Sequence, residues 1–318
     1  MTEFNTKINN YFLSKIKLIL TTSLLILVLA IIPTSTIFAH SPVFTEENHD
    51  PSYAYQISDF TKSWVIYATL DHPDEGAYYK FTASKGDRIY ISLMTSENPT
   101  TSGYLPSFAL LTPGSVSKDT LPSYIEVPEG LGAILVDGKE PDKASYEPFT
   151  PGWLYDIATI SIDAPEDGTY YIVVFDSSQK TGNYSLAVGY IESFTITEWI
   201  MIPYYIHETY AWEGQNIFVT YLPIILTIII GSIIFLWQKK RTKEPRGISK
   251  WLAAFAGLTF LGTTLSIFYQ IILAISITGF FSAVIITIII ASIGLVLSFL
   301  TLLYAFKKKQ TLTSGKRI

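Results

Sequence analysis

The sequence contains no cysteine. This absence excludes a disulfide framework, a zinc–thiolate site, an iron–sulfur site and a cysteine nucleophile. A domain outside the cell must therefore be stabilised by a hydrophobic core without disulfides, and about 150 residues are enough to bury one.

Basic residues are scarce in the middle of the chain. Residues 41–216 hold 25 of the 27 Asp and Glu but only 8 of the 22 Lys and Arg, a balance of −17. Such an acidic region repels nucleic acid, so that class of partner is excluded. The remaining basic residues flank apolar stretches, as expected when positive loops stay in the cytoplasm.

Three long apolar runs, at 217–237, 251–275 and 280–306, contain no Asp, Glu, Lys, Arg or His. Each is long enough to cross about 30 Å of hydrocarbon. The loop 238–250 and the tail 307–318 are rich in Lys and Arg, which predicts that both lie in the cytoplasm. Ion-coupled transporters place ionisable groups at mid-membrane, so the lack of such groups argues against a transporter.

Small residues recur within the first two of these runs. Gly231 and Gly257 each follow another small residue by four positions. This spacing allows close packing of helices, either within the chain or with a partner.

Another apolar run lies within residues 1–40, after several lysines and before Ala39. A basic start, an apolar run and a small residue predict a signal peptide, or a signal anchor if cleavage fails. In both cases residues 41–216 are expected outside the cytoplasmic membrane and the C-terminus inside, which makes this a multi-pass protein of the cell membrane.

Residues 63–190 consist of short alternating apolar and polar runs separated by Gly, Pro, Asp and Asn. Runs 77–83 and 88–93 flank the turn Lys85-Gly86-Asp87, which predicts a hairpin. About eight such strands predict an all-β antiparallel sandwich of the jelly-roll kind. Residues 41–62 are expected to form an extended segment leading into it.

Four segments carry a family pattern. The motifs Y-x-F-x-A-x-x-G-D, a middle strand, A-P-x-D-G-x-Y-x-x-x-V and G-x-Y-x-L-x-V occupy residues 77–93, 106–111, 160–174 and 182–188. They resemble the bacterial and archaeal pre-peptidase C-terminal domain. The resemblance implies a β-sandwich in a prokaryotic surface protein, and such domains are not themselves catalytic. It departs from the family in a long insertion at 112–156.

No Gly-x-Ser-x-Gly, His-Glu-x-x-His or EF-hand motif occurs, so neither an enzyme nor a cofactor is expected. Two weaker patterns suit a metal. The carboxylates of Asp71, Asp74 and Glu75, beside His72, suit calcium, but they lack alternating ligand spacing, and a solvated turn is the favoured explanation. Cleavage after Ala39 would make His40 the N-terminus, where its amine and ring nitrogen suit copper with His49 or His72 as a further ligand. A flexible terminus without a metal is the alternative.

Two further sites are predicted outside the membrane. Residues 191–216 form an aromatic neck, expected to lie on the membrane surface as a partial helix interrupted by Pro203, or else to dock another membrane protein; its aromatic residues are Trp199, Tyr204, Tyr205, Tyr210 and Trp212. Asn183-Tyr184-Ser185 is a glycosylation sequon, expected in the last hairpin turn.

These observations lead to three hypotheses about function. The first is a membrane protein, bound to the lipid bilayer, whose non-catalytic sandwich binds a protein, a glycan or an envelope component outside the cell. One span would be enough for an anchor, so the extra spans suggest an accessory subunit of a membrane complex as the second. The third is copper or calcium binding outside the cell.

Overall fold

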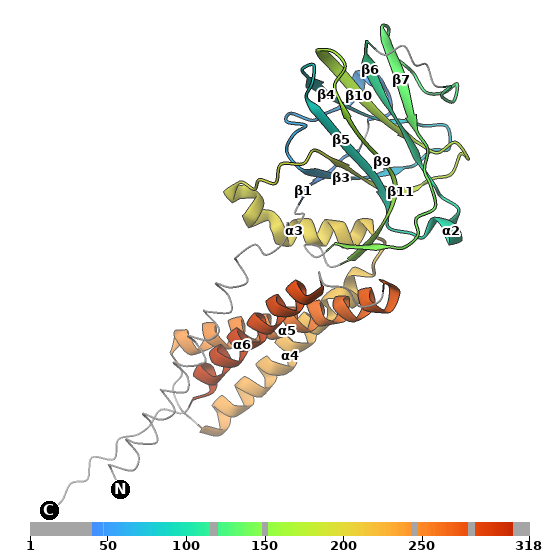
Figure 1. Cartoon of the computed structure of the whole chain (residues 1–318). Helices are drawn as coiled ribbons and strands as arrows, with labels where there is room; N and C mark the ends of the chain where they lie inside the picture. The colour runs from blue at the N-terminus through green and yellow to red at the C-terminus, as the bar shows by residue number, and fades with distance from the viewer. Residues whose placement is uncertain are drawn as a thin grey trace, which may run out of the picture. The chain divides into compact units, whose positions relative to one another are not determined.

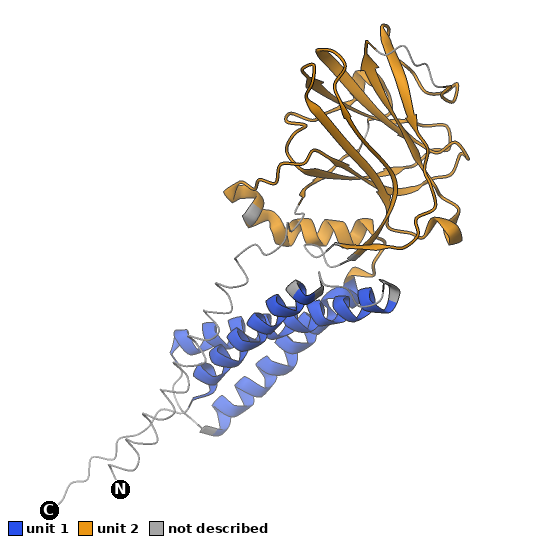
Figure 2. Ribbon diagram, viewed as in Figure 1, with its two compact units in different colours: residues 1–37, 218–276, 280–318 blue, residues 38–217, 277–279 orange. Residues whose placement is uncertain are grey.

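The computed structural model describes residues 40–46, 48–114, 120–147, 152–242, 247–278 and 284–307. These residues belong to two compact units (Figure 2). One unit holds all of the described strands and helix α3, and the other holds the three long helices. The predicted signal segment and most of the basic tail lie outside the described residues.

The unit that holds the strands, orange in Figure 2, is a sandwich of two β-sheets (Figure 1). The six-stranded sheet has the order β1-β3-β11-β5-β9-β8, with the strands β1 Ser41–Phe44, β3 Trp64–Leu70, β11 Gly182–Val188, β5 Arg88–Thr95, β9 Gly152–Asp163 and β8 Ser145–Glu147. The five-stranded sheet has the order β2-β4-β10-β6-β7, with the strands β2 Tyr55–Gln56, β4 Ala77–Ala83, β10 Gly168–Phe175, β6 Ser107–Pro113 and β7 Leu131–Val136. Two single-turn helices, η1 Pro51–Tyr53 and α2 Pro99–Ser102, complete the connections.

The predicted β-sandwich is confirmed, and it is larger than expected at its N-terminal side. Strand β1 pairs parallel with β3, and β2 pairs parallel with β4, whereas the other pairs in both sheets are antiparallel. Residues 41–62 therefore contribute edge strands to both sheets and are not merely a lead-in segment.

The predicted hairpin between β4 and β5 is wrong. β4 lies in the five-stranded sheet and β5 in the six-stranded sheet, so the turn at 84–87 crosses from one sheet to the other. The turn between β9 and β10 also crosses from one sheet to the other. The two turns are joined by a hydrogen bond in which Gly86 N donates to the Ala164 carbonyl at 2.8 Å. Alternation with period two fixes which side chains face inward, but it does not say whether the next strand lies beside the first or across the core.

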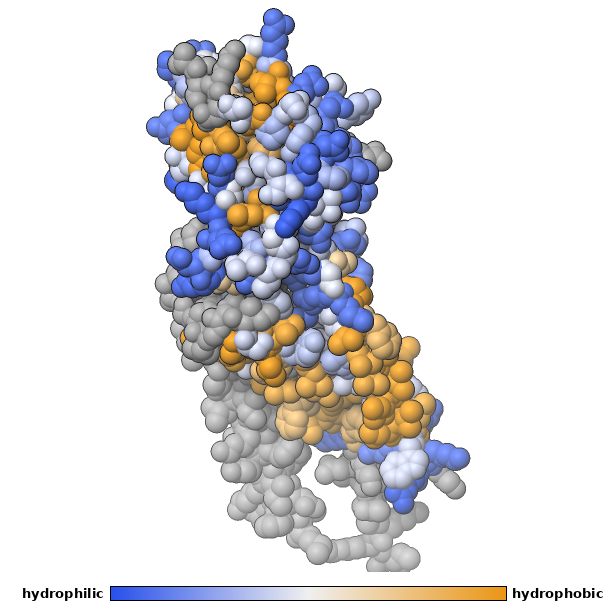
Figure 3. All heavy atoms as spheres, turned by 90° about the vertical axis from the view of Figure 1, so that its right-hand side faces the viewer, coloured by the Kyte–Doolittle hydropathy of each residue, from blue (hydrophilic) through white to orange (hydrophobic). Residues whose placement is uncertain are grey.

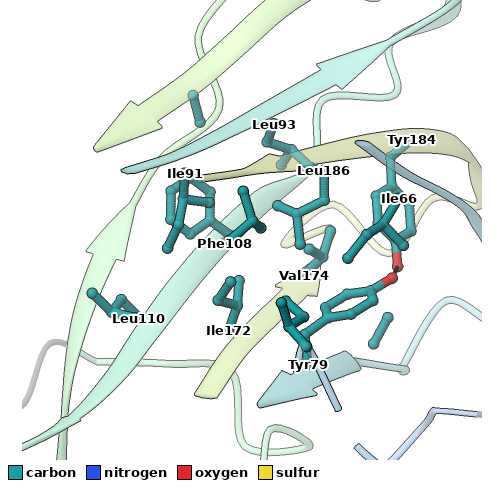
Figure 4. Close-up of a cluster of buried hydrophobic side chains, with 14 of the residues drawn as sticks. Ile66, Tyr79, Ile91, Leu93, Phe108, Leu110, Ile172, Val174, Tyr184 and Leu186 are labelled. Carbon is teal, nitrogen blue, oxygen red and sulfur yellow. Dashed lines mark hydrogen bonds between the residues drawn. The ribbon is translucent and has the colours of Figure 1, made fainter. Parts of the chain in front are cut away.

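The core lies between the sheets and is built largely from aromatic and branched side chains (Figure 4). Tyr79 of β4 and Tyr184 of β11 are fully buried, and their hydroxyl oxygens lie 2.6 Å apart in a hydrogen bond that joins the two sheets. A buried hydroxyl without a partner costs free energy, so this bond allows the core to hold both tyrosines.

The outer face of the five-stranded sheet is covered by part of the long insertion. Ile125 packs against Tyr78 and Val173 in a second apolar cluster. The segment is also fixed by polar contacts, because Glu126 N donates to Tyr78 Oη at 2.8 Å and Tyr124 Oη donates to the Asp176 carbonyl at 3.1 Å. Residues 124–126 of the insertion are therefore a packed part of the sandwich.

The helical unit, blue in Figure 2, is built from α4 Ile217–Thr242, α5 Ile248–Thr278 and α6 Val284–Phe306. All three are long and apolar enough to cross a membrane, over Ile217–Arg241, Ile248–Ser276 and Thr287–Phe306. The predicted membrane spans are confirmed, although α4 and α5 extend further than the sequence indicated. Figure 3 shows hydrophobic side chains gathered over these helices.

Helix α5 is held to both neighbours by polar side chains and close approaches. Ser266 Oγ donates to the Thr220 carbonyl of α4 at 2.9 Å, and Ser298 Oγ of α6 donates to the Gly257 carbonyl at 2.8 Å. The same helix carries Gly262, which leaves no room for a side chain beside α4. Interhelical hydrogen bonds and small residues are the usual stabilising contacts inside a bilayer.

Candidate functional site

His40 lies beside the start of β3. Its Nδ1 is 2.6 Å from Ser63 Oγ, and burial lowers the pKa of the imidazole. His49 instead contacts Glu75, in the loop that follows β3. His72 lies in the same loop. A strand of seven residues is about 20 Å long, so the structure does not bring His40 together with either proposed copper partner, His49 or His72.

The loop between β3 and β4 forms an acidic end of the sandwich. Asp71, His72 and Asp74 are exposed there. The carboxylate of Glu75 accepts a hydrogen bond from His72 N at 3.1 Å with one oxygen, and its other oxygen contacts His49 Nδ1. Within the described ranges, no three His, Asp or Glu side chains converge on a point where a metal ion could bind. Calcium and copper therefore stay predictions, without a preformed site to support them.

Asp176 lies beneath this end and was missed by the sequence reasoning. It is buried, and its carboxylate accepts hydrogen bonds from Leu105 N at 3.1 Å and Ser178 N at 2.6 Å. Burial raises the pKa of Tyr124, and the nearby carboxylates of Asp176 and Asp74 raise it further. The sequence feature that could have indicated Asp176 is its position directly after the buried strand β10, where an Asp commonly begins a turn. From here on, the acidic end means the loop carboxylates Asp71, Asp74 and Glu75 together with Asp176 beneath them.

Asn183 lies within β11, whereas the sequence suggested a turn. Its side-chain oxygen accepts a hydrogen bond from Thr69 Oγ1 at 2.8 Å, and its Nδ2 donates to the Trp212 carbonyl. A glycan would be attached through this same nitrogen. Glycosylation here stays a prediction, but it would require the end of α3 to move away.

The aromatic neck is mostly one helix, α3 Ile196–Trp212, and Pro203 does not end it. The helix begins with a capping box, in which Glu198 N donates to Thr195 Oγ1 at 3.2 Å and Thr195 N donates to Glu198 Oε2 at 2.6 Å. Such a box satisfies two backbone donors at the start of a helix.

The neck aromatics do not share one environment. Tyr204 is half exposed and Tyr205 partly exposed, but Tyr210 and Trp212 are buried. Trp212 packs edge-on against Tyr67 with ring centres 4.8 Å apart, and its Nε1 donates to the Ala68 carbonyl at 2.9 Å. The prediction that Trp212 faces the membrane surface is therefore wrong, because the sheet offers its ring both apolar contact and an acceptor. Trp199 lies in α3, and its side chain is outside the described part.

An ion pair holds the other end of α3 to the sandwich. Lys62 Nζ lies 2.5 Å from Glu198 Oε1, and both side chains are largely buried. The ammonium also lies 4.0 Å from the centre of the Trp64 ring, a favourable cation–π contact. Burial alone would raise the pKa of Glu198, but the bonds from Lys62 and Thr195 outweigh it and lower the pKa to about 2. Helix α3 is thus attached to the six-stranded sheet near both of its ends.

We expect Lys62→Met to loosen the first turns of α3. The folded-state pKa of Glu198 is about 2, below its ordinary value of 4.5, so the pair stabilises the docked helix above pH 4.5 and loses this effect as the pH falls towards 2. Hydrogen-exchange protection of residues 196–202 should therefore fall in the wild type over that range, and be low in the variant even at pH 7. Lys85→Met, at an exposed lysine, is the control. Equal protection of wild type and Lys62→Met at pH 7 would contradict this role.

Comparison with known proteins gives partial likenesses only. No family model and no curated protein match this chain. The pre-peptidase C-terminal domain of a collagenase from Bacillus anthracis, the domain that the four motifs resemble, aligns at 15% identity over 45% of this chain and 97% of its own, with a TM-score of 0.25.

Two solved copper-binding proteins also align. The secreted protein MopE of Methylococcus capsulatus does so at 12% identity over 36% of this chain and 69% of its own, with a TM-score of 0.18. The surface-associated protein CorA of Methylomicrobium album BG8 does so at 14% identity over 48% of this chain and 99% of its own, with a TM-score of 0.22. At these scores the likenesses carry no argument about function, and the sandwich is assigned from its own sheets.

Proposed function

We propose that this protein is a multi-pass membrane protein that displays the sandwich outside the cell and binds an envelope protein through the acidic end. The observation that carries this proposal is the excess of carboxylates on the sandwich, most of which form no ion pair in the described part of the chain. Of the acids in residues 41–216, only Glu75 and Glu198 form ion pairs within the described ranges, and neither Asp71 nor Asp74 does. An exposed surface of one charge sign attracts a partner of the opposite sign over several ångströms.

The outward orientation is supported by the distribution of basic residues. Lys239, Lys240 and Arg241 occupy the last turn of α4, and the loop and tail beyond the spans are rich in Lys and Arg. Positive loops stay in the cytoplasm, and three spans then put the sandwich and the C-terminus on opposite sides. No nucleophile or metal cluster recognised in the described ranges points to catalysis, so binding is the proposed activity.

Crosslinking on intact cells tests both parts of this proposal. A membrane-impermeant amine-reactive crosslinker should capture a stoichiometric basic partner with the wild type, and several-fold less with Asp71→Asn/Asp74→Asn, because this variant removes two exposed charges from the acidic end. The matched control is Asp163→Asn/Glu166→Gln, which removes two exposed charges elsewhere on the sandwich. Capture should also weaken as salt is raised, since salt screens exposed charges. A sandwich that reacts only after the cells are opened would show that the orientation is wrong.

The packing of the three spans favours a second candidate, an accessory subunit of a membrane complex. The helices are joined by interhelical hydrogen bonds from Ser266 and Ser298, a more elaborate arrangement than a simple anchor needs. The same experiment separates the two functions. Capture of a membrane partner to equal extent by the wild type and by the acidic-end variant would favour the subunit.

A further inference from the structure

The first half of α3 carries an exposed apolar row, which ends at Tyr204 beside the carboxylate of Glu208. Ile196, Ile200 and Tyr204 are 81%, 72% and 50% exposed, and they recur every four residues along the helix. Side chains with this spacing lie on one side of a helix, about 12 Å from end to end over eight residues. Two isoleucines and a tyrosine in one exposed row form a patch of the kind that marks an interaction site.

The opposite side of α3 is held by the sandwich. Glu198 pairs with Lys62 near the first turn, and Trp212 packs on Tyr67 and bonds to Ala68 at the last residue. With contacts near both ends, the helix cannot rotate its apolar row inward without breaking an ion pair or removing a buried indole. The row therefore stays turned away from the sheet.

The chain connection limits what this row can meet. Only residues 213–216 separate α3 from the span that begins at Ile217, a reach of about 18 Å if fully extended. The linker is not extended, because Gly214 N and Gln215 N bond back to carbonyls of the last turn of α3, both at 3.0 Å. The end of α3 must therefore stay close to the point where the chain enters the hydrocarbon.

We infer that α3 lies on the bilayer, with the Ile196–Ile200–Tyr204 face inserted among the lipid headgroups, and that it fixes the sandwich against the membrane. Isoleucine side chains gain by entering the apolar boundary, and a tyrosine there keeps its hydroxyl in the headgroup zone. Residues 191–216 contain no Lys or Arg, so insertion should need no anionic lipid. The inference concerns how the sandwich is held and does not depend on which partner the acidic end binds or on which side it faces.

Spin labelling of the full chain tests this inference, and the absence of native cysteine makes single labels unambiguous. The label is placed at Ile200→Cys or Tyr204→Cys, and the protein is reconstituted into phosphatidylcholine vesicles at low density. Oxygen dissolves in lipid and a nickel chelate in water, so the ratio of their collision rates with the label reports the depth of the label. This ratio should be several-fold higher at either position than at Tyr53→Cys, a water-exposed site on the sandwich, and lower than at Ile229→Cys, in the middle of the α4 span.

Two results would overturn the inference. A ratio equal to that of Tyr53→Cys would mean that the face lies in water. Protection from both reagents, with spin–spin broadening between labels, would mean that a second copy of the chain covers it. A further check is Ile196→Ser/Ile200→Ser, which changes only exposed side chains; it should leave hydrogen-exchange protection of the sandwich strands unchanged while lowering the ratio at Tyr204→Cys.

Discussion

Replacing Trp212 by alanine should lower the free energy of unfolding of the sandwich by about 3–5 kcal/mol, the usual range for removing a buried Trp or Phe. The side chain joins an apolar cluster with Val65, Tyr67 and Ala187 on the outer face of the six-stranded sheet. Its Nε1 also donates to the Ala68 carbonyl, and that bond would be lost. The end of α3 should then detach, which also exposes Asn183.

The measurement is a urea titration of the full chain in detergent, followed by a short pulse of protease that digests only unfolded sandwich. Trp212→Ala should move the midpoint to clearly lower urea. Tyr53→Ala removes an exposed aromatic residue from the same unit and should leave the midpoint almost unchanged. If the two variants shifted the midpoint equally, the helix would not be part of the folded sandwich.

The Gly262→Leu variant should force α4 and α5 apart. A Cβ atom at this position would lie 2.5 Å from Ile224 Cα, and a backbone atom cannot turn aside as a side chain can. Overpacking commonly lowers the free energy of unfolding by about 1–3 kcal/mol, and we expect a cost at the top of this range or above it when a helix backbone has to move. The Ser266–Thr220 bond, one turn away on the same helix, should break as well.

A disulfide between engineered cysteines provides the measurement. A Cβ atom built on Gly231 would lie 3.0 Å from Leu258 Cγ, so Gly231→Cys/Leu258→Cys should oxidise readily in membranes. Adding Gly262→Leu should abolish most of this crosslinking, whereas adding Ser292→Leu, at an exposed position of α6, should not. Undiminished crosslinking in the Gly262→Leu background would mean that α4 and α5 do not pack at this point.

The sequence predicts which side chains of each strand face the core better than it predicts which strands are neighbours in a sheet. The inward faces of β4 and β5 follow from alternation, since Tyr79, Phe81, Ile89 and Ile91 are all buried as the pattern requires. Which strands would be neighbours did not follow, because an inward face can be satisfied by a partner beside it or by one across the core. The membrane spans followed from length and apolarity alone, and Gly231 and Gly257 do lie at close helix contacts.

The contacts of α3 could not be predicted from the sequence. A Trp and several Tyr before a membrane span are typical of residues at a lipid surface, yet Trp212 is buried against strands more than a hundred residues earlier in the chain. The Lys62–Glu198 pair likewise joins residues 136 positions apart, and nothing in the local pattern of either residue indicates it. The sequence pattern also does not distinguish the exposed isoleucines of α3, on which the inference about the bilayer rests, from those of a buried helix.

The place of β11 in the six-stranded sheet has a consequence for biosynthesis. This strand is the last of the sandwich along the chain, yet it lies between β3 and β5 and pairs with both. Until residues 182–188 have been synthesised and have paired, β3 and β5 each present an unpaired edge to any other chain nearby. A nascent or truncated chain that stops short of β11 is therefore open to aggregation, and the six-stranded sheet can be completed only after this last strand has been made.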